Sequence, residues 1–340
     1  YALFLVSQGV IQNMSDYLTV TTLAGDSQSI AMGPVASQEA VKLLGTNGGG
    51  FFNVNSAHPF ENPTPLTNFL EALAIFAIPT GLTYAFGRMV GHQREGWMLW
   101  QVMGALFVLA FTAFVYTEST GNPLLQAIGA EGLSWEGKDA RFDLGALSLF
   151  STVTTSASCG AVAVMHDSLM PLSGMVTMVL MQLGEVVFGG VGAGFYGMIV
   201  MAVIAVFIAS LMVGRTPEYL GKKITPKEMK LAALTMLTVP FIVLAGTGIN
   251  LMLPGALESL NNPGAHGLSE ILYAWTSAAN NNGSAFAGLN ANTAFYNIGL
   301  AIAMWLGRFI VIVLTLALAG TLARERHVPS GKGTLDTASH

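Results

Sequence analysis

Five long apolar runs constrain the fold of this chain more than any other feature. They cover residues 66–87, 97–117, 172–213, 229–253 and 296–322, and each can cross a hydrocarbon core that needs about 20 helical residues. Lipid offers the backbone no hydrogen bonds, so such runs fold as helices. Only 10% of the residues are charged, against roughly 25% in soluble domains. The sequence therefore predicts an all-α, multi-pass membrane protein.

The third run is too long for one straight span. Residues 172–213 number 42 and carry one charge, Glu185. As a single helix they would measure about 63 Å, twice the hydrocarbon thickness. The stretch FGGVGAGF contains the glycines that favour a break, because glycine weakens a helix and tolerates unusual dihedral angles. We expect the break at Gly189, Gly190, Gly192 and Gly194.

Three shorter amphiphilic segments lie between the runs, at residues 37–44, 144–157 and 268–279. They are too short to cross a bilayer and suit half-membrane helices. Each leads into a polar, glycine-containing segment, which we call a knot: GTNGGGF, TSASCGAV and AANNNGSAF. The central glycines of the knots are 112 and 123 residues apart, and this spacing indicates a repeated unit.

Knots of this kind inside a membrane predict a cation site. Backbone that leaves a helix at this depth must be buried in protein or line a watery cavity. Glycine-centred segments that meet there would present rings of carbonyl oxygens, which can replace the hydration shell of a cation. The negative ends of the half-helices would add a favourable potential. The neighbouring Ser, Thr, Asn and Cys side chains are neutral, so we expect dipoles to select the ion.

Other interpretations of the knots are weaker. Any one of them could be an ordinary turn between helices, but three in equivalent positions favour a shared role. A phosphate-binding loop needs Lys and then Ser or Thr after its last glycine, whereas Phe51 and Phe52 stand there. An intramembrane enzyme could use the nearby His, Asp and Asn side chains, but no pairing of nucleophile and base is visible.

Basic residues predict the orientation. Of the 14 Lys and Arg, ten lie on one side of the predicted spans, three lie on the other, and Arg308 lies within a run. The positive-inside rule therefore places loops 88–94 and 215–230 and the C-terminal tail in the cytoplasm. The half-membrane segments then enter from outside.

Several long stretches resemble a known family. They are similar to the potassium-binding subunits of the Kdp potassium-transporting ATPase, in the superfamily of potassium transporters. This resemblance runs through nearly the whole chain. The stretches are MGPVASQEAVKLLGTNGGGFFNVNSAHPFENPTPLTN, TTSASCGAVAVMHDS, MQLGEVVFGGVGAGFYGM, GRTPEYLGKKI and TSAANNNGSAFAGL.

The resemblance implies four pseudo-symmetric membrane-pore-membrane repeats around one selectivity filter. Residues 1–96, 97–227 and 228–325 would be the second, third and fourth repeats, followed by a cytoplasmic tail at 326–340. We expect the first repeat and a last helix to be missing, so that this fragment alone would not close a complete filter. The implied potassium-binding filter residues are Thr46, Asn47, Gly48, Ser158, Cys159, Gly160, Asn281, Asn282 and Gly283.

The function implied by the resemblance is potassium import into a bacterium across its inner membrane. The subunit would pass external potassium through an intramembrane tunnel to a separate P-type ATPase subunit, which hydrolyses ATP, with small accessory membrane subunits of the Kdp complex as further partners. The chain has no Asp-Lys-Thr-Gly-Thr motif, so we expect a non-catalytic subunit that needs no cofactor besides its transported ion. The alternative is a stand-alone potassium or sodium transporter of the same superfamily; the stretch RTPEYLGKKITPKEMK argues against it.

A gate below the filter is also implied. The four glycines of the expected break resemble the family's gating region, and Glu185, Arg215 and Arg308 are further gate or tunnel candidates. Arg308 would either limit leak below the filter, or form a packing ion pair or snorkel toward the interface. Glu185 would pair with a basic group rather than ligate potassium directly. Arg215 would join the gate or anchor the membrane interface.

Histidines lie near all three knots. His58, His166 and His266 share no metal-ligand spacing, so we expect loop hydrogen bonds from them rather than a metal site. Asp167 and Glu61 lie on the same outer loops. We expect these two carboxylates to attract cations to the mouth.

Overall fold

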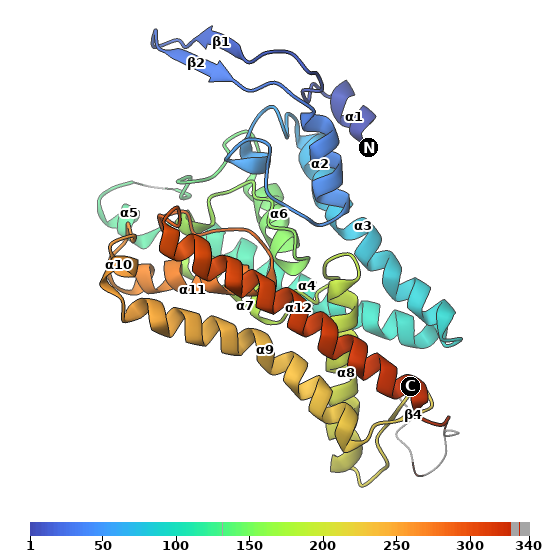
Figure 1. The fold of residues 1–340 in the computed structure, drawn as a ribbon. Helices are drawn as coiled ribbons and strands as arrows, with labels where there is room; N and C mark the ends of the chain where they lie inside the picture. Colours follow the sequence, from blue (N-terminus) through green and yellow to red (C-terminus); the bar gives the residue numbers. More distant parts are fainter. Residues whose placement is uncertain (131, 328–332, 334–340) are drawn as a thin grey trace.

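The chain is built of long helices that pack against three short ones. A computed structural model describes residues 1–130, 132–327 and 333, and Figure 1 shows α2, α6 and α11 converging on the middle of the molecule. The main apolar core lies between α3, α4 and α6, where Ile75, Phe114 and Phe150 are buried. The predicted tail at 326–340 lies largely outside the described residues.

Five helices of the described chain are long and apolar enough to cross a membrane. Large apolar side chains such as Leu109, Phe241 and Trp305 stand exposed on three of them, as lipid-facing positions require. The expectation of an all-α membrane protein is confirmed. The five helices are α3 (Pro65–Met89), α4 (Gln93–Ser119), α8 (Ala193–Met212), α9 (Pro226–Leu251) and α12 (Ala294–Arg324).

Two of these spans begin at strong local signals. Thr64 and Thr225 each form a capping box with the residue three positions later, and Pro65 and Pro226 occupy the first helical turn. Such caps satisfy backbone N–H groups that a helix start leaves without partners, and proline fits there because it has no N–H group.

The third apolar run is broken as expected. It forms α7 (Pro171–Gln182) and α8 (Ala193–Met212), joined by the irregular segment 183–192, which we call the break loop. The break begins earlier than the glycine stretch, directly after α7.

The three half-helices each pack between the helices that flank them in sequence. The α2 helix contacts α1 (Ala2–Ser7) and α3, α6 contacts α4 and α7, and α11 contacts α9 and α12. The same arrangement of helix, half-helix and helix therefore recurs along the chain. The half-helices are α2 (Val35–Leu44), α6 (Leu144–Ser156) and α11 (Gly264–Asn280).

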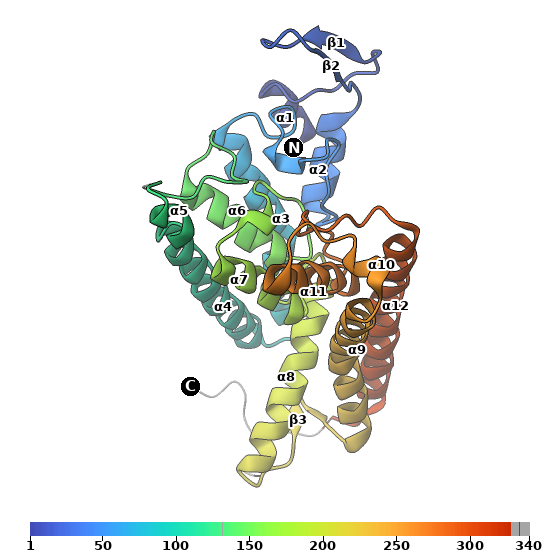
Figure 2. The same cartoon turned by 90° about the vertical axis from the view of Figure 1, so that its left-hand side faces the viewer.

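Two small β-hairpins lie at opposite ends of the molecule (Figure 2). The first was not expected from the sequence, although its strands contain Thr, Val and Ile and turn at Gly25, a residue that favours tight turns. The hairpins and remaining short elements are β1 (Leu18–Thr21), β2 (Ser27–Ile30), β3 (Glu218–Tyr219), β4 (Lys222–Lys223), α5 (Pro123–Ala127), α10 (Pro254–Leu257), η1 (Asn55–Ala57) and η2 (His166–Ser168).

Candidate functional site

The three knots share one backbone conformation. In each, a half-helix ends and a non-glycine residue takes a left-handed φ between 52° and 62°, which side chains rarely adopt. Two residues later a glycine takes a φ between 66° and 101°. The pairs are Thr46 and Gly48, Ser158 and Gly160, and Asn281 and Gly283.

The knots meet each other through their backbones. A Cβ atom at Gly48 would lie 1.5 Å from the Cys159 carbonyl oxygen, and one at Gly160 would lie 2.0 Å from the Asn282 carbonyl oxygen. Both positions therefore require glycine. Cys159 and Asn282 each directly precede the central glycine of their knot. The same contact, from this carbonyl oxygen to the central glycine of the preceding knot, is therefore made twice. A Cβ at Gly283 would meet no atom within 4 Å.

The break loop lies against the knots. The Val191 N–H donates to the Thr46 hydroxyl oxygen at 3.2 Å, and the Asn282 side-chain amide donates to a Glu185 carboxylate oxygen at 2.6 Å. A Cβ at Gly190 would lie 3.2 Å from Ser158 Cβ. The loop thus contacts all three knots at once.

A cavity of about 100 Å³ adjoins the break loop. Glu185, Gly194 and Arg308 line it, together with Ser158 and Asn281 of the knots. Of the other predicted gate residues, Gly189 packs against Gly194, Gly192 caps α8 and Arg215 lies just beyond the end of α8. The structure therefore brings Glu185 and Arg308 to one cavity and leaves Arg215 outside its lining.

Comparison with known proteins assigns the chain to a family. The family model described as the potassium-transporting ATPase A subunit matches residues 1–340. The chain belongs to this family. It is 59% identical over 348 positions to the "Potassium-transporting ATPase potassium-binding subunit" of Methylibium petroleiphilum, and 61% identical over 339 positions to the protein of that description from Laribacter hongkongensis. Each alignment covers 99% of this chain and 60% of the relative, so the chain spans about 60% of these relatives' length.

A buried relay of polar side chains supports the Gly283 knot in this member of the potassium-transporting ATPase A subunit family. His166 Nδ1 lies 2.7 Å from the Tyr273 hydroxyl, which lies 2.7 Å from the Ser284 hydroxyl. Ser284 donates to Asn282 Oδ1 at 2.5 Å, and the Asn282 amide reaches Glu185. All five side chains are buried.

Hydrogen-bond chemistry sets the direction of this relay. An amide oxygen only accepts, so Ser284 donates to Asn282 and must accept from Tyr273. The Tyr273 oxygen then accepts from His166 Nδ1–H, which fixes the tautomer of the ring. Burial lowers the pKa of His166 to about 4, so the ring stays neutral at physiological pH.

A buried ion cluster supports the Gly48 knot. Lys42, in the last turn of α2, lies 2.7 Å from a Glu39 carboxylate oxygen and 3.0 Å from a Glu61 oxygen. The other Glu61 oxygen accepts from the Phe52 N–H at 2.8 Å. Glu61 is fully buried, so the expectation that it attracts cations at the mouth was wrong. Glu61 instead connects Phe52, which follows the knot, to Lys42 in the half-helix α2.

A similar buried pair lies beside the second half-helix. Lys138 Nζ is 3.0 Å from a Glu118 oxygen, and the other Glu118 oxygen accepts from the Met170 N–H, one residue before α7. Neither lysine was predicted to form a buried ion pair. Glu39 and Lys42 lie three positions apart on one helix, a spacing visible in the sequence, but Glu61 and Lys42, and Glu118 and Lys138, are 19 and 20 positions apart.

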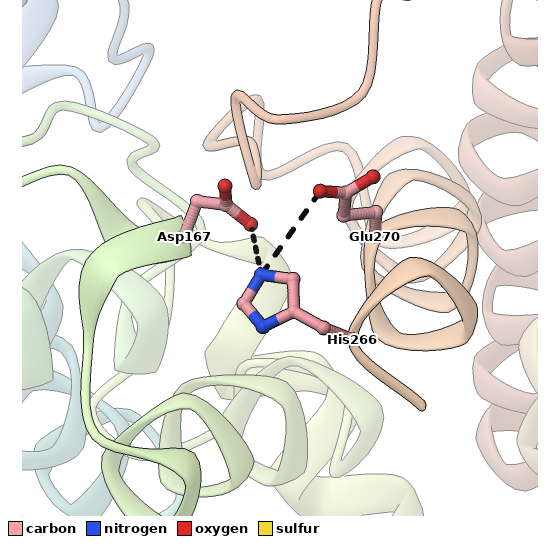
Figure 3. Close-up of side chains that lie close together, drawn as sticks. All are labelled: Asp167, His266 and Glu270. Carbon is pink, nitrogen blue, oxygen red and sulfur yellow. Dashed lines mark hydrogen bonds and ion pairs between the residues drawn. The ribbon is translucent and has the colours of Figure 1, made fainter. Parts of the chain in front are cut away.

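The three histidines differ in their surroundings. His58 Nδ1 accepts from the Phe60 N–H at 3.2 Å, and His166 belongs to the relay, so loop hydrogen bonding is confirmed for both. His266 also makes such a hydrogen bond, to the Asp167 carboxylate at 2.8 Å, and the Glu270 carboxylate lies beside it, as Figure 3 shows.

Proposed function

We propose that this chain forms part of the potassium-binding subunit of an ATP-driven potassium import pump. The observation that carries the proposal is the convergence of three knots with one backbone conformation, in which carbonyl oxygens of successive knots approach the glycines of their neighbours. Backbone carbonyl oxygens are the groups that replace water around potassium. The printed descriptions of the relatives, which name a potassium-binding subunit, support the same ion.

We assign the ion-binding role to the backbone of the nine predicted filter residues. Their side chains are neutral, so the ion would be held by dipoles. The ends of α2, α6 and α11 point their C-terminal dipoles toward the knots, which favours a cation there. The chain would thus supply three strands of the filter, within the three repeats that the sequence suggests at 1–96, 97–227 and 228–325.

The break loop and the cavity would form the gate and the start of an ion path. Contacts from Val191 and Glu185 to the knots support this role, because an ion leaving the filter would pass the loop. Arg308, in the cavity lining, would oppose direct escape of a cation, because like charges repel at short range. The ion would then be directed sideways, toward a partner protein.

The partner would be a P-type ATPase subunit that hydrolyses ATP, accompanied by small accessory membrane subunits. The chain itself would be non-catalytic and would require no cofactor. Its five long apolar helices support a multi-pass location, for which we propose the bacterial inner membrane. A passive transporter of the same superfamily is the alternative that the experiment must exclude.

The first arm of the experiment measures potassium uptake into vesicles that contain the full-length protein with and without the ATPase partner. We expect uptake only with the partner and ATP, because the proposed gate prevents passive flow. Uptake at an equal rate without them would overturn the pump-subunit assignment.

The second arm tests the filter with Gly283→Asp. A Cβ at this position meets no atom, but the φ of 101° is strained for any side chain. The variant should therefore shift the backbone carbonyl groups of the knot and add a carboxylate beside them. We expect the potassium affinity to fall roughly tenfold or more, about 1.4 kcal/mol, and the preference over sodium to weaken. Gly129→Asp is the matched control, since Gly129 also has a positive φ and open space but lies far from the knots in sequence. Unchanged affinity and selectivity in Gly283→Asp would contradict the carbonyl filter.

A further inference from the structure

A cluster of possible metal ligands lies outside the knots and their supporting networks. Asp167 Oδ1 is 2.8 Å from His266 Nε2, and Glu270 Oε1 is 4.0 Å from the same nitrogen. One donor atom from each of the three residues lies within 4.8 Å of the others. Figure 3 shows Asp167 on the segment after the Gly160 knot, and His266 and Glu270 on the first turns of α11.

The burial of the Glu270 carboxylate is a second feature that points to a bound cation. Its side chain is 0% exposed, and one carboxylate oxygen has no hydrogen-bond partner among the described residues. The other oxygen accepts from the Asn262 amide at 2.6 Å and faces the cluster. A buried carboxylate requires compensation by hydrogen bonds or positive charge, and the groups around Glu270 supply only part of it.

The backbone of Gly288 approaches closely where the two carboxylates converge. A Cβ atom at Gly288 would lie 2.1 Å from Glu270 Oε1 and 2.5 Å from Asp167 Oδ2. Any side chain there would collide with both oxygens, so only glycine lets the backbone lie beside the two carboxylates without displacing them. Two carboxylates this close repel each other unless a cation or a proton lies between them.

We propose that Asp167, His266 and Glu270 bind a divalent transition metal of the zinc class. The imidazole nitrogen favours such a metal over Mg²⁺ or Ca²⁺, which prefer an all-oxygen shell. Two carboxylate oxygens and one nitrogen form a three-ligand set, and water would complete a tetrahedral shell. Donor atoms on one tetrahedral Zn²⁺ are about 3.4 Å apart at bond lengths near 2.1 Å. This lies between the 2.8 Å and 4.0 Å of the present arrangement, so small side-chain rotations would bring the donor atoms to that spacing.

The site is reachable from solvent, because His266 is 44% exposed while Glu270 forms a buried floor. A bound ion would join the segment that follows the Gly160 knot to the first turns of α11. It would therefore link the chain that follows one knot to the half-helix that leads into the next knot. This binding inference does not depend on the transport function proposed above.

The test is an isothermal calorimetric titration with Zn²⁺. The tag-free, full-length protein is first treated with EDTA and desalted. We expect one saturable Zn²⁺ site in the wild type, with neither Mg²⁺ nor K⁺ giving the same signal. The single cysteine of the chain, Cys159, is fully buried and should not contribute. Absence of saturable Zn²⁺ binding, or an equal signal from Mg²⁺, would overturn the proposal.

Single variants assign the site. His266→Gln changes an exposed side chain and should leave the fold intact, so it remains informative even where Glu270→Gln fails to fold. We expect His266→Gln, Asp167→Asn and Glu270→Gln each to weaken Zn²⁺ binding by roughly tenfold or more, because even outer partners of metal ligands are worth about 10- to 100-fold. His58→Gln is the matched control and should bind as the wild type does. Wild-type affinity in His266→Gln would show that Zn²⁺ binds elsewhere and would refute the site.

Discussion

Tyr273 is the residue through which an outer loop reaches the Gly283 knot. Its hydroxyl accepts from His166 and donates to Ser284, which in turn fixes Asn282. Asn282 lies in the knot, and its carbonyl oxygen approaches Gly160. The relay therefore determines where the backbone of one knot stands relative to the next.

Tyr273→Phe should disturb the site without changing the shape of the core. The variant removes one hydroxyl and leaves His166 and Ser284 with an unsatisfied donor and acceptor, at a cost of about 1–3 kcal/mol. We expect a lower melting temperature and, within the proposed function, a weaker preference for potassium over sodium. Thermal unfolding and competition transport assays measure these two effects.

Tyr296→Phe is the control for this prediction. Tyr296 is also buried, and its hydroxyl donates to the Ala256 carbonyl oxygen at 3.1 Å, away from the relay. The Tyr296→Phe variant should have a lower melting temperature but the same preference for potassium over sodium. Equal selectivity in both variants would mean that the relay only stabilises the fold.

Residue-level features were predictable from the sequence where they are local. The knots are visible there because glycine and short polar residues interrupt apolar surroundings, and Gly48 and Gly160 do stand at close backbone contacts. The relay joins His166 to Tyr273, 107 positions away, and His266 meets Asp167 across 99 positions. Such pairs depend on how the half-helices pack, which no local pattern in one sequence encodes.

At the level of elements, the break between α7 and α8 depends on one close approach. A Cβ at Gly194 would lie 2.1 Å from Gly189 Cα and 2.7 Å from the Glu185 carbonyl oxygen. The first turn of α8 thus packs directly on the backbone of the break loop. Length and glycine content predicted that the run breaks. They did not predict that the loop folds back onto the knots, because this requires the contacts from Val191 and Glu185.

Gly194→Ala should therefore displace the break loop. The added methyl group cannot be accommodated without backbone movement, and overpacking of this kind costs about 1–3 kcal/mol. We expect a lower melting temperature and a weaker contact between Glu185 and Asn282. Thermal unfolding of the purified protein measures the first effect.

Gly248→Ala is the matched control for this change. Gly248 lies within α9, and a Cβ there would meet nothing within 4 Å. Because alanine is about 1 kcal/mol better than glycine inside a helix, this variant should melt at the same temperature or higher. A melting temperature for Gly194→Ala equal to that of Gly248→Ala would refute the packing argument.

At the scale of the whole molecule, the hairpin of β1 and β2 and the hairpin of β3 and β4 mark opposite ends (Figure 2). The second end carries basic residues such as Lys222, Lys223 and Lys227. Hydropathy predicted the spans and the half-helices, and the distribution of Lys and Arg predicted that basic residues gather at one end of the molecule. Both depend on the composition along the chain. The order in which helices pack around the knots came only from the structure.

The polarity predicts which end a membrane-impermeant maleimide can reach. Ala24→Cys places a thiol at the exposed tip of the first hairpin, and Lys227→Cys places one in the exposed first turn of α9. Cys159 is buried, so the parent chain should give little background labelling once cysteines outside this chain are replaced by serine. In spheroplasts we expect Ala24→Cys to react at once and Lys227→Cys to react only after the membrane is permeabilised. The reverse pattern would contradict the orientation, because it would place the basic loops outside, against the charge bias that holds such loops in the cytoplasm.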